Sequence, residues 1–266
     1  MKRLILFISL WAVFSVAALN SQNISPLTAL GEEAFRAKKY KTAVEYFSQA
    51  AEEGDAQAQY RLGECYFFKK GVRRDYKKAA YWSEKAAQKG IASAQYLLGA
   101  CYYKGKGVKK DAREAVVWFD KAARQGVAVA QQELGSCYAN GFGVEKNDTT
   151  AMRWFSEAAR QGLAEAQFAL GACFYEGKGV EKDTDKAFYW YRKAAYQELA
   201  EAQYFLGMSY YSGLGVEQDN TQAIKWLEKA LENGLDIKTL SAVLGHSSAE
   251  TTISVYSHVT GEMERN

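Results

Sequence analysis

The chain has 266 residues, of which 48% are hydrophobic and 24% charged, and this ordinary folded composition excludes disorder as its main state. Its formal net charge of +3 falls to +1 once Lys2 and Arg3 are removed, so no basic footprint for nucleic acid or an anionic membrane is expected. The two histidines lie near the C-terminus and the four cysteines lie far apart, which gives no zinc-ligand spacing and predicts neither a metal nor a cofactor.

Residues 1–21 have the pattern of a signal peptide. Lys2 and Arg3 precede an apolar run over 4–16, and the small residues after it suit cleavage between about residues 18 and 22. The run is short for a membrane span, which needs about 20 residues. The alternative is an uncleaved N-terminal anchor. We therefore expect export to the periplasm or the outside, with no stable membrane span after cleavage.

A period of 36 residues runs from residue 60 to residue 234. A Leu-Gly pair, a Gly-Val pair and a tryptophan all keep this step independently, which indicates five structural repeats. The Leu-Gly pairs are Leu62-Gly63, Leu98-Gly99, Leu134-Gly135, Leu170-Gly171 and Leu206-Gly207, and the tryptophans are Trp82, Trp118, Trp154, Trp190 and Trp226.

Each repeat is predicted to form two helices, as its second copy illustrates. Leu98 and Tyr102 lie four residues apart on one face of a first helix. The glycines of the turn over 105–108 allow positive φ, Asp111 is a suitable N-cap for a second helix, and Gly126 is suited to end that helix. Because one unit cannot bury its apolar face alone, the units must stack on one another.

This repeat, seen in full over 94–126, resembles the Sel1-like repeat, a relative of the tetratricopeptide repeat. Five copies cover 60–234, and a shorter unit over 27–59 lacks the glycine turn and looks like an ordinary tetratricopeptide unit. The resemblance implies an all-α fold, a right-handed α-solenoid of helix-turn-helix repeats, which acts as an adaptor without catalytic residues. Lys69 replaces a turn glycine and Glu198 replaces a closing glycine, which predicts local differences in those two loops.

The four cysteines share one repeat position. Equivalent positions in stacked repeats should lie roughly 10 Å apart at helix-packing distances, and this exceeds the Cα separation of about 7 Å that a disulfide tolerates. We expect small, buried, unpaired thiols, and the alternatives are an intermolecular link or a metal role. The cysteines are Cys65, Cys101, Cys137 and Cys173.

A partner-binding surface is expected on the first helices, which line the concave face in helical-repeat relatives. Four positions per first helix point away from the core, and those of the third and fourth repeats are Gln132, Ser136, Ala139 and Asn140, then Phe168, Ala172, Tyr175 and Glu176. Aromatic anchors with polar neighbours suit peptide recognition. The alternative is that the rings pack against adjacent repeats as ordinary core. The candidate partner-binding residues are Tyr60, Phe67, Tyr96, Tyr103, Phe168, Tyr175, Tyr204 and Tyr211.

The segment 235–266 departs from the repeat and resembles the C-terminal end of tyrosine recombinases, or phage-type integrases. The run 244–247, Leu-Gly-His-Ser, and Tyr256 ten residues after His246 carry the likeness. In that family the histidine assists phosphoryl transfer and the tyrosine attacks a DNA phosphate. The resemblance therefore offers an alternative function, a recombinase fragment whose catalytic residues would be His246 and Tyr256.

Two features weigh against retained recombinase catalysis. The family's arginines come from an upstream domain, one of them in a His-x-x-Arg run, and no histidine precedes His246. The tail holds two basic and four acidic residues, a balance that repels DNA. We expect a helical cap in which Ile237, Leu240 and Leu244 cover the last repeat. The favoured function is a non-enzymatic, exported scaffold that binds a peptide or an envelope protein, with no nucleic-acid partner.

Overall fold

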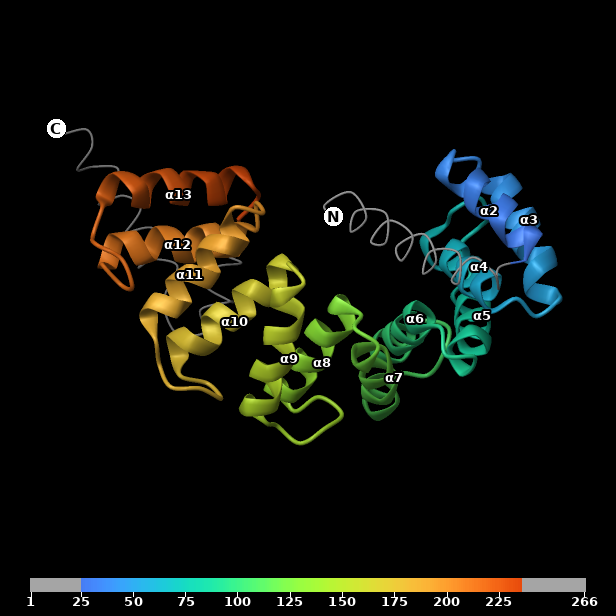
Figure 1. Ribbon diagram of the computed structural model, residues 1–266, viewed down its shortest axis with the longest axis horizontal. Helices are drawn as coiled ribbons and strands as arrows, with labels where there is room; N and C mark the ends of the chain where they lie inside the picture. The colour runs from blue at the N-terminus through green and yellow to red at the C-terminus, as the bar shows by residue number, and fades with distance from the viewer. Residues whose placement is uncertain (1–24, 236–266) are drawn as a thin grey trace, which may run out of the picture. The chain divides into compact units, whose positions relative to one another are not determined.

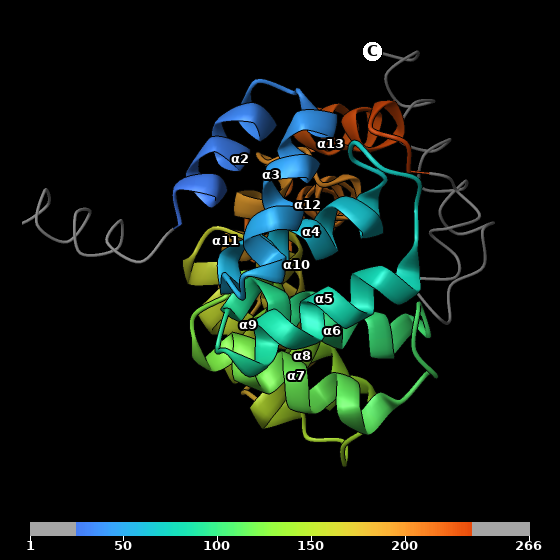
Figure 2. The same cartoon turned by 90° about the vertical axis from the view of Figure 1, so that its right-hand side faces the viewer.

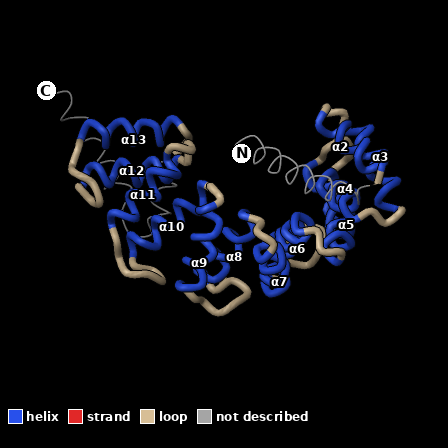
Figure 3. The backbone as a smooth tube through the Cα atoms, in the orientation of Figure 1, coloured by secondary structure: helices blue, strands red, loops and turns tan. Residues whose placement is uncertain are grey.

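The computed structural model describes residues 25–235, which form helices and loops and contain no strand (Figures 1 and 3). The predicted signal peptide and the recombinase-like tail, with His246 and Tyr256, lie outside the described residues. Within this range no helix is both long enough and apolar enough to cross a membrane.

The described helices pair into consecutive hairpins. They fall into two compact units, with residues 1–125 in the first and 126–266 in the second. Figures 1 and 2 show the hairpins of the first unit following one another in chain order. The helices of the first unit are α2 (Pro26–Arg36), α3 (Tyr40–Glu52), α4 (Ala56–Phe68), α5 (Tyr76–Gln88), α6 (Ala92–Lys104) and α7 (Ala112–Arg124). Those of the second are α8 (Ala128–Asn140), α9 (Asp148–Arg160), α10 (Ala164–Glu176), α11 (Thr184–Ala195), α12 (Ala200–Ser212) and α13 (Asn220–Glu232).

Within each unit, every hairpin packs on the next, as α3 does on α4 and α9 does on α10. The predicted all-α solenoid of helix-turn-helix repeats is confirmed. The helix boundaries follow from local chemistry, because each second helix of the five full repeats has a polar N-cap. The Asp111 carboxylate, for example, accepts hydrogen bonds from the backbone N–H groups of Arg113 and Glu114 at 2.9 and 3.1 Å.

The turns keep a left-handed residue even where the glycine is missing. Gly105 ends α6 with φ 65° and ψ 33°, and Lys69 ends α4 with φ 62° and ψ 39°. Glu198 likewise has φ 65° where the other repeats close with glycine. The predicted difference is therefore wrong at Lys69, whereas before Glu198 helix α11 ends at Ala195, one residue earlier than the other second helices of the full repeats. Contacts with the rest of the repeat hold the turn, and the side chain adopts a left-handed conformation at some cost.

The second turn glycine sets how closely successive repeats approach. A Cβ atom on Gly107 would lie 1.9 Å from the carbonyl oxygen of Tyr76, at the start of the preceding second helix. The equivalent Gly179 and Gly215 meet Asp148 and Thr184 in the same way. No side chain fits in that space, so the glycine is required by the stacking itself.

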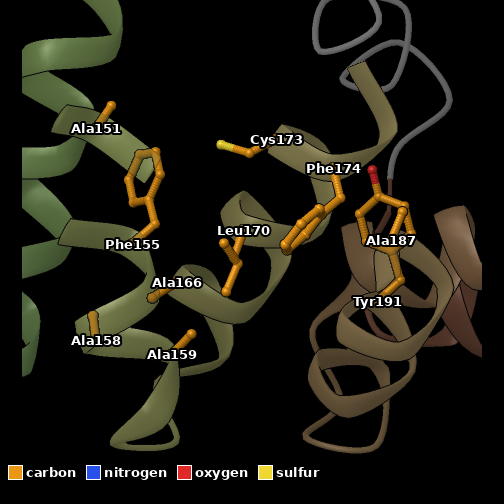
Figure 4. Close-up of a cluster of buried hydrophobic side chains, with 10 residues drawn as sticks. All are labelled: Ala151, Phe155, Ala158, Ala159, Ala166, Leu170, Cys173, Phe174, Ala187 and Tyr191. Carbon is orange, nitrogen blue, oxygen red and sulfur yellow. The ribbon is translucent and has the colours of Figure 1, made fainter. Parts of the chain in front are cut away.

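The core repeats along with the backbone. Figure 4 shows a cluster from α9, α10 and α11 in which Leu170 and Cys173 point towards α9 while Phe174 lies on the side of α11. The glycine of each Leu-Gly pair faces a side chain of the second helix, which is a ring in the second, third and fourth repeats, and a Cβ on Gly171 would lie 2.8 Å from the Tyr191 ring. A small residue at this position lets the two helices of a hairpin pack closely.

A buried glutamine on the first helix ties successive repeats together. The side-chain N–H of Gln95 donates to the Ala87 carbonyl of the preceding helix, and its oxygen accepts from Gln125, which also donates to the Gly90 carbonyl. The same pairing recurs between Gln197 and Gln167. Because every polar atom of the side chain is partnered, the buried amide stabilises the stack.

Candidate functional site

The second unit carries a hollow of about 550 Å³ that follows one face of α10. The α10 residues that line it recur at helical spacing from the first turn to the last, over about 17 Å at 1.5 Å per residue. We call this hollow the α10 groove. The lining residues on α10 are Glu165, Phe168, Ala169, Ala172, Cys173 and Glu176. The walls are Gln132, Ala139 and Asn140 of α8, Phe155 of α9, Lys178 after α10, and Leu199 and Glu201 at the start of α12.

The floor of the α10 groove is apolar and its aromatic ring is held in place. The ring of Phe168 lies 5.6 Å from Tyr191 and 5.4 Å from Phe205, measured between centroids. Ala169 and Ala172 are half-buried beside it and leave the space above the helix open. A groove with this floor is suited to receive an apolar side chain.

The charges of the groove are unbalanced. Lys178 pairs with Glu176, and this hydrogen bond raises the pKa of Lys178. Glu165 and Glu201 occupy the same repeat position in the first turns of α10 and α12, and within residues 25–235 neither forms an ion pair. Each also lies where a helix N-terminus favours a negative charge. At one end the groove therefore has two carboxylates that no side-chain cation of residues 25–235 pairs with.

The equivalent face of α4 in the first unit is filled instead. Arg61 and Glu64 stand where α10 has its two alanines, and the Arg61 Nη1 to Glu64 Oε2 distance is 2.8 Å. Arg61 also pairs with Glu32 of α2, with 2.5 Å between Nε and Oε1, and Lys70 lies 3.4 Å from Glu64. These side chains neutralise one another and cover the helix surface.

Most of the predicted aromatic anchors are half-buried, and several pack against neighbouring rings or core clusters. Phe168 alone among them lines the α10 groove. Tyr96 and Tyr103 are half-buried with ring centroids 5.9 and 6.3 Å from Phe119, and Phe67 lies 5.3 Å from Tyr76. Tyr60, Tyr175 and Tyr211 are also half-buried; Tyr60 packs on the α5–α6 core, and Tyr175 packs on the cluster of Figure 4.

Tyr204 corrects the expectation most clearly. It is only 5% exposed and packs with Leu227, Ala230 and Leu235 of the last hairpin. The ring fills the space beside α13, so it contributes to the core and is not available as an anchor.

The helical spacing of the sequence predicted some of the residues that line the α10 groove and missed others. Ala172 and Glu176 were among the positions predicted to point away from the core, and both line the groove. Glu165, Ala169 and Glu201 were missed. The available signal was helical spacing, because Glu165 and Ala169 precede Ala172 by seven and three residues and share its face.

The four cysteines are buried and unpaired, as predicted. Burial raises the pKa of Cys65, Cys101 and Cys137 to about 12 and that of Cys173 to about 11. Cys173 is 8% exposed and lines the α10 groove. At neutral pH these groups are neutral thiols, which are poor nucleophiles and poor metal ligands.

Solved structures confirm the fold. The Sel1 repeat protein from Oxalobacter formigenes matches with a TM-score of 0.76 and 31% sequence identity, covering 88% of this chain and 97% of that one. The c5321 protein of uropathogenic Escherichia coli, a protective antigen with an SLR fold, matches with a TM-score of 0.74 and 34% identity. That match covers 89% of this chain and 53% of the E. coli chain.

A short match of a different kind also exists. Over 35 residues the chain is 54% identical to the tyrosine recombinase XerC of Chlamydia caviae, which is 13% of this chain and 11% of that recombinase. This match supports the predicted likeness to a tyrosine recombinase but spans a small part of that protein.

The sequence profile of the Sel1 repeat matches six successive segments, 32–55, 56–91, 92–127, 128–163, 164–199 and 200–235. The first of these lies within the hairpin for which the sequence favoured a tetratricopeptide-like unit. Together the segments cover more than half of the chain, and their boundaries follow the helix hairpins. The chain therefore belongs to the Sel1 repeat family.

Proposed function

We propose that this protein is a non-enzymatic interaction scaffold whose second unit binds a segment of a partner protein in the α10 groove. Sel1 repeat proteins generally mediate protein–protein interactions. The observation that carries the proposal is the groove itself, whose open apolar floor spans first helices of successive repeats. Such an elongated groove suits a chain segment better than a compact small molecule.

The scaffold proposal includes the absence of catalysis in the groove. Its most reactive element by type is the Cys173 thiol, and burial holds the pKa of that thiol near 11. Its carboxylates lie at the ends of the groove, with Glu165 in the first turn of α10 and Glu176 in the last. This arrangement favours recognition over chemistry.

We propose further that the protein is exported through its leader, residues 1–21, and meets a peptide or envelope protein there. The support is the basic and apolar pattern of this segment. N-terminal sequencing of protein from the cell envelope tests the proposal, and we expect an N-terminus between about residues 18 and 22. An intact Met1 on cytoplasmic protein would refute it.

The recombinase-like tail is proposed to have no DNA-cleaving activity. Phosphoryl transfer requires cations placed around the phosphate, and the chain has no histidine before His246 to supply the family's His-x-x-Arg run. Incubation with DNA followed by denaturing electrophoresis should give no covalent adduct. An adduct that disappears in Tyr256→Phe would establish the alternative function.

A site-directed cross-linking experiment tests the groove. A photoreactive residue at Ala139, on the wall of the groove, should capture a partner in cells, whereas the same residue at the exposed Tyr189 of α11 should not. Adding Ala169→Arg with Ala172→Glu should abolish capture, because this pair copies Arg61 and Glu64 and fills the groove. Equal capture with and without the pair, at unchanged thermal stability, would place the binding surface elsewhere.

A further inference from the structure

We infer that the partner segment of the α10 groove is basic and apolar: a lysine or arginine lies between Glu165 and Glu201, and an apolar side chain next to it lies over Phe168 and Ala172. The inference rests on the proposed function and specifies the chemistry of its partner. It follows from the unequal charge of the groove together with its apolar floor.

The two carboxylates have no cation of their own within residues 25–235. The one lysine that lines the groove, Lys178, is engaged with Glu176. Glu165 and Glu201 come from neighbouring first helices and line the same hollow, so both can face one cation of a bound segment. An ammonium or guanidinium group satisfies them, whereas an acidic segment is repelled.

In the first unit, one arginine pairs with two carboxylates on neighbouring first helices. There Arg61 lies against Glu32 and Glu64, on first helices of successive hairpins, and its guanidinium also lies 5.4 Å from the centre of the Phe35 ring. The α10 groove has alanine in the place of both Arg61 and Glu64, and its two carboxylates lie at another repeat position, in the first turns of α10 and α12, beside the Phe168 ring but without an arginine. The partner supplies the missing cation in this arrangement.

The apolar floor determines the rest of the segment. The apolar floor extends from the carboxylate end towards the middle of α10 and consists of Phe168, Ala169 and Ala172, with Leu199 beside it at the start of α12. The groove follows about 17 Å of helix, which an extended chain of about five residues spans at about 3.3 Å per residue. One cation followed by one or two apolar side chains therefore fills it.

Synthetic peptides test the inference directly. We choose a fluorescein-labelled nonapeptide with lysine and leucine in alternation at its centre, a twin with glutamate for lysine, and a twin with serine for leucine. Fluorescence anisotropy is measured with the full chain at low and moderate salt. The lysine–leucine peptide should bind at least about tenfold more tightly than either twin, and added salt should weaken its binding.

Matched variants connect the charge preference to the groove. Glu165→Gln with Glu201→Gln should weaken the lysine–leucine peptide about fivefold, the loss typical of two partly exposed ion pairs. Glu181→Gln with Glu217→Gln removes the same charge from the same two repeats at exposed loop positions outside the groove, and should change binding little.

Three outcomes would overturn the inference: equal binding of the lysine and glutamate peptides, no binding of the lysine–leucine peptide, or equal loss in both double variants. The proposed function has its own readout, which is cross-linked capture at Ala139 and its loss when Ala169 and Ala172 are replaced. If that capture holds while the peptides show no charge preference, the groove binds a partner of other chemistry.

Discussion

Lys89 interrupts the glutamine pairing that ties the repeats together, and replacing it should stabilise the first unit. Lys89 stands at the repeat position of Gln125, and the two backbones are alike, with φ −84° and −85°. Its ammonium group donates to the Gly54 carbonyl at 2.5 Å. The buried side-chain oxygen of Gln59 has no hydrogen-bond partner in the described part of the chain. In the next repeat, the oxygen of the equivalent Gln95 accepts a hydrogen bond from Gln125.

The expected gain follows from that unpaired oxygen. A buried acceptor without a hydrogen bond costs about 1–3 kcal/mol. In Lys89→Gln the new amide donates to both Gly54 and Gln59, as Gln125 does to Gly90 and Gln95 at 3.1 and 2.7 Å. Losing the charged hydrogen bond of Lys89 offsets part of the gain, so we expect a net stabilisation of about 1 kcal/mol.

Equilibrium urea unfolding monitored by circular dichroism measures the effect. A gain of about 1 kcal/mol should raise the midpoint by about 0.5 M at a typical urea slope for a small domain. The matched control is Gln125→Lys, which leaves the Gln95 oxygen unpaired and should lower the midpoint. If Lys89→Gln leaves the midpoint unchanged while Gln125→Lys lowers it, the Gln59 oxygen is not a cost; if neither changes it, the pairing contributes nothing to stability.

Other changes test the remaining features. Tyr191→Phe should raise the free energy of unfolding by about 1 kcal/mol, because the hydroxyl is buried without a partner, and an unchanged thermal midpoint would refute this. Lys69→Gly should stabilise by about 0.5–1 kcal/mol in denaturant unfolding by removing a left-handed lysine, while Gly107→Ala should destabilise strongly against the Tyr76 carbonyl. The pKa values of the thiols are about 11–12 in the folded protein and about 8.5 in the unfolded chain. Burial of the neutral thiols therefore contributes fully to the free energy of unfolding below about pH 8.5, and this contribution is lost as the pH rises towards 12. In alkylation followed by mass spectrometry, Cys173 should react first and the other three only in denaturant.

The sequence period predicted the fold because the repeated residues do structural work at every step. Gly107 recurs since no side chain fits against the preceding helix, and Asp111 recurs since a helix start requires a cap. Such requirements are local or lie one repeat away, so they can be deduced from spacing. The tolerance of Lys69 for a left-handed turn was not deduced, because tertiary contacts override the local preference of one residue there.

The candidate site was harder to predict because the groove depends on small side chains, which leave space above the helix. An aromatic stripe suggested binding anchors, yet Tyr204 is buried by the last hairpin and Tyr96 packs beside Phe119. Which ring is covered depends on the neighbouring repeat and not on its own spacing. The groove lies where Ala169 and Ala172 leave space, and pattern analysis has little reason to single out alanines on a helix.

The constant stacking positions and the variable surface positions together explain how the same repeat can form the solenoid and also carry a binding site. The positions of the Leu-Gly pair and the buried glutamine are the same in α4 and α10, whereas the pair at 61 and 64 becomes alanine at 169 and 172. Arginine and glutamate there fill the α4 face with internal ion pairs, and two alanines open the α10 groove without altering the helix. A repeat array can therefore gain or lose a binding site by substitution at two partly exposed positions, while the Leu-Gly pair and the buried glutamine that build the stack stay the same.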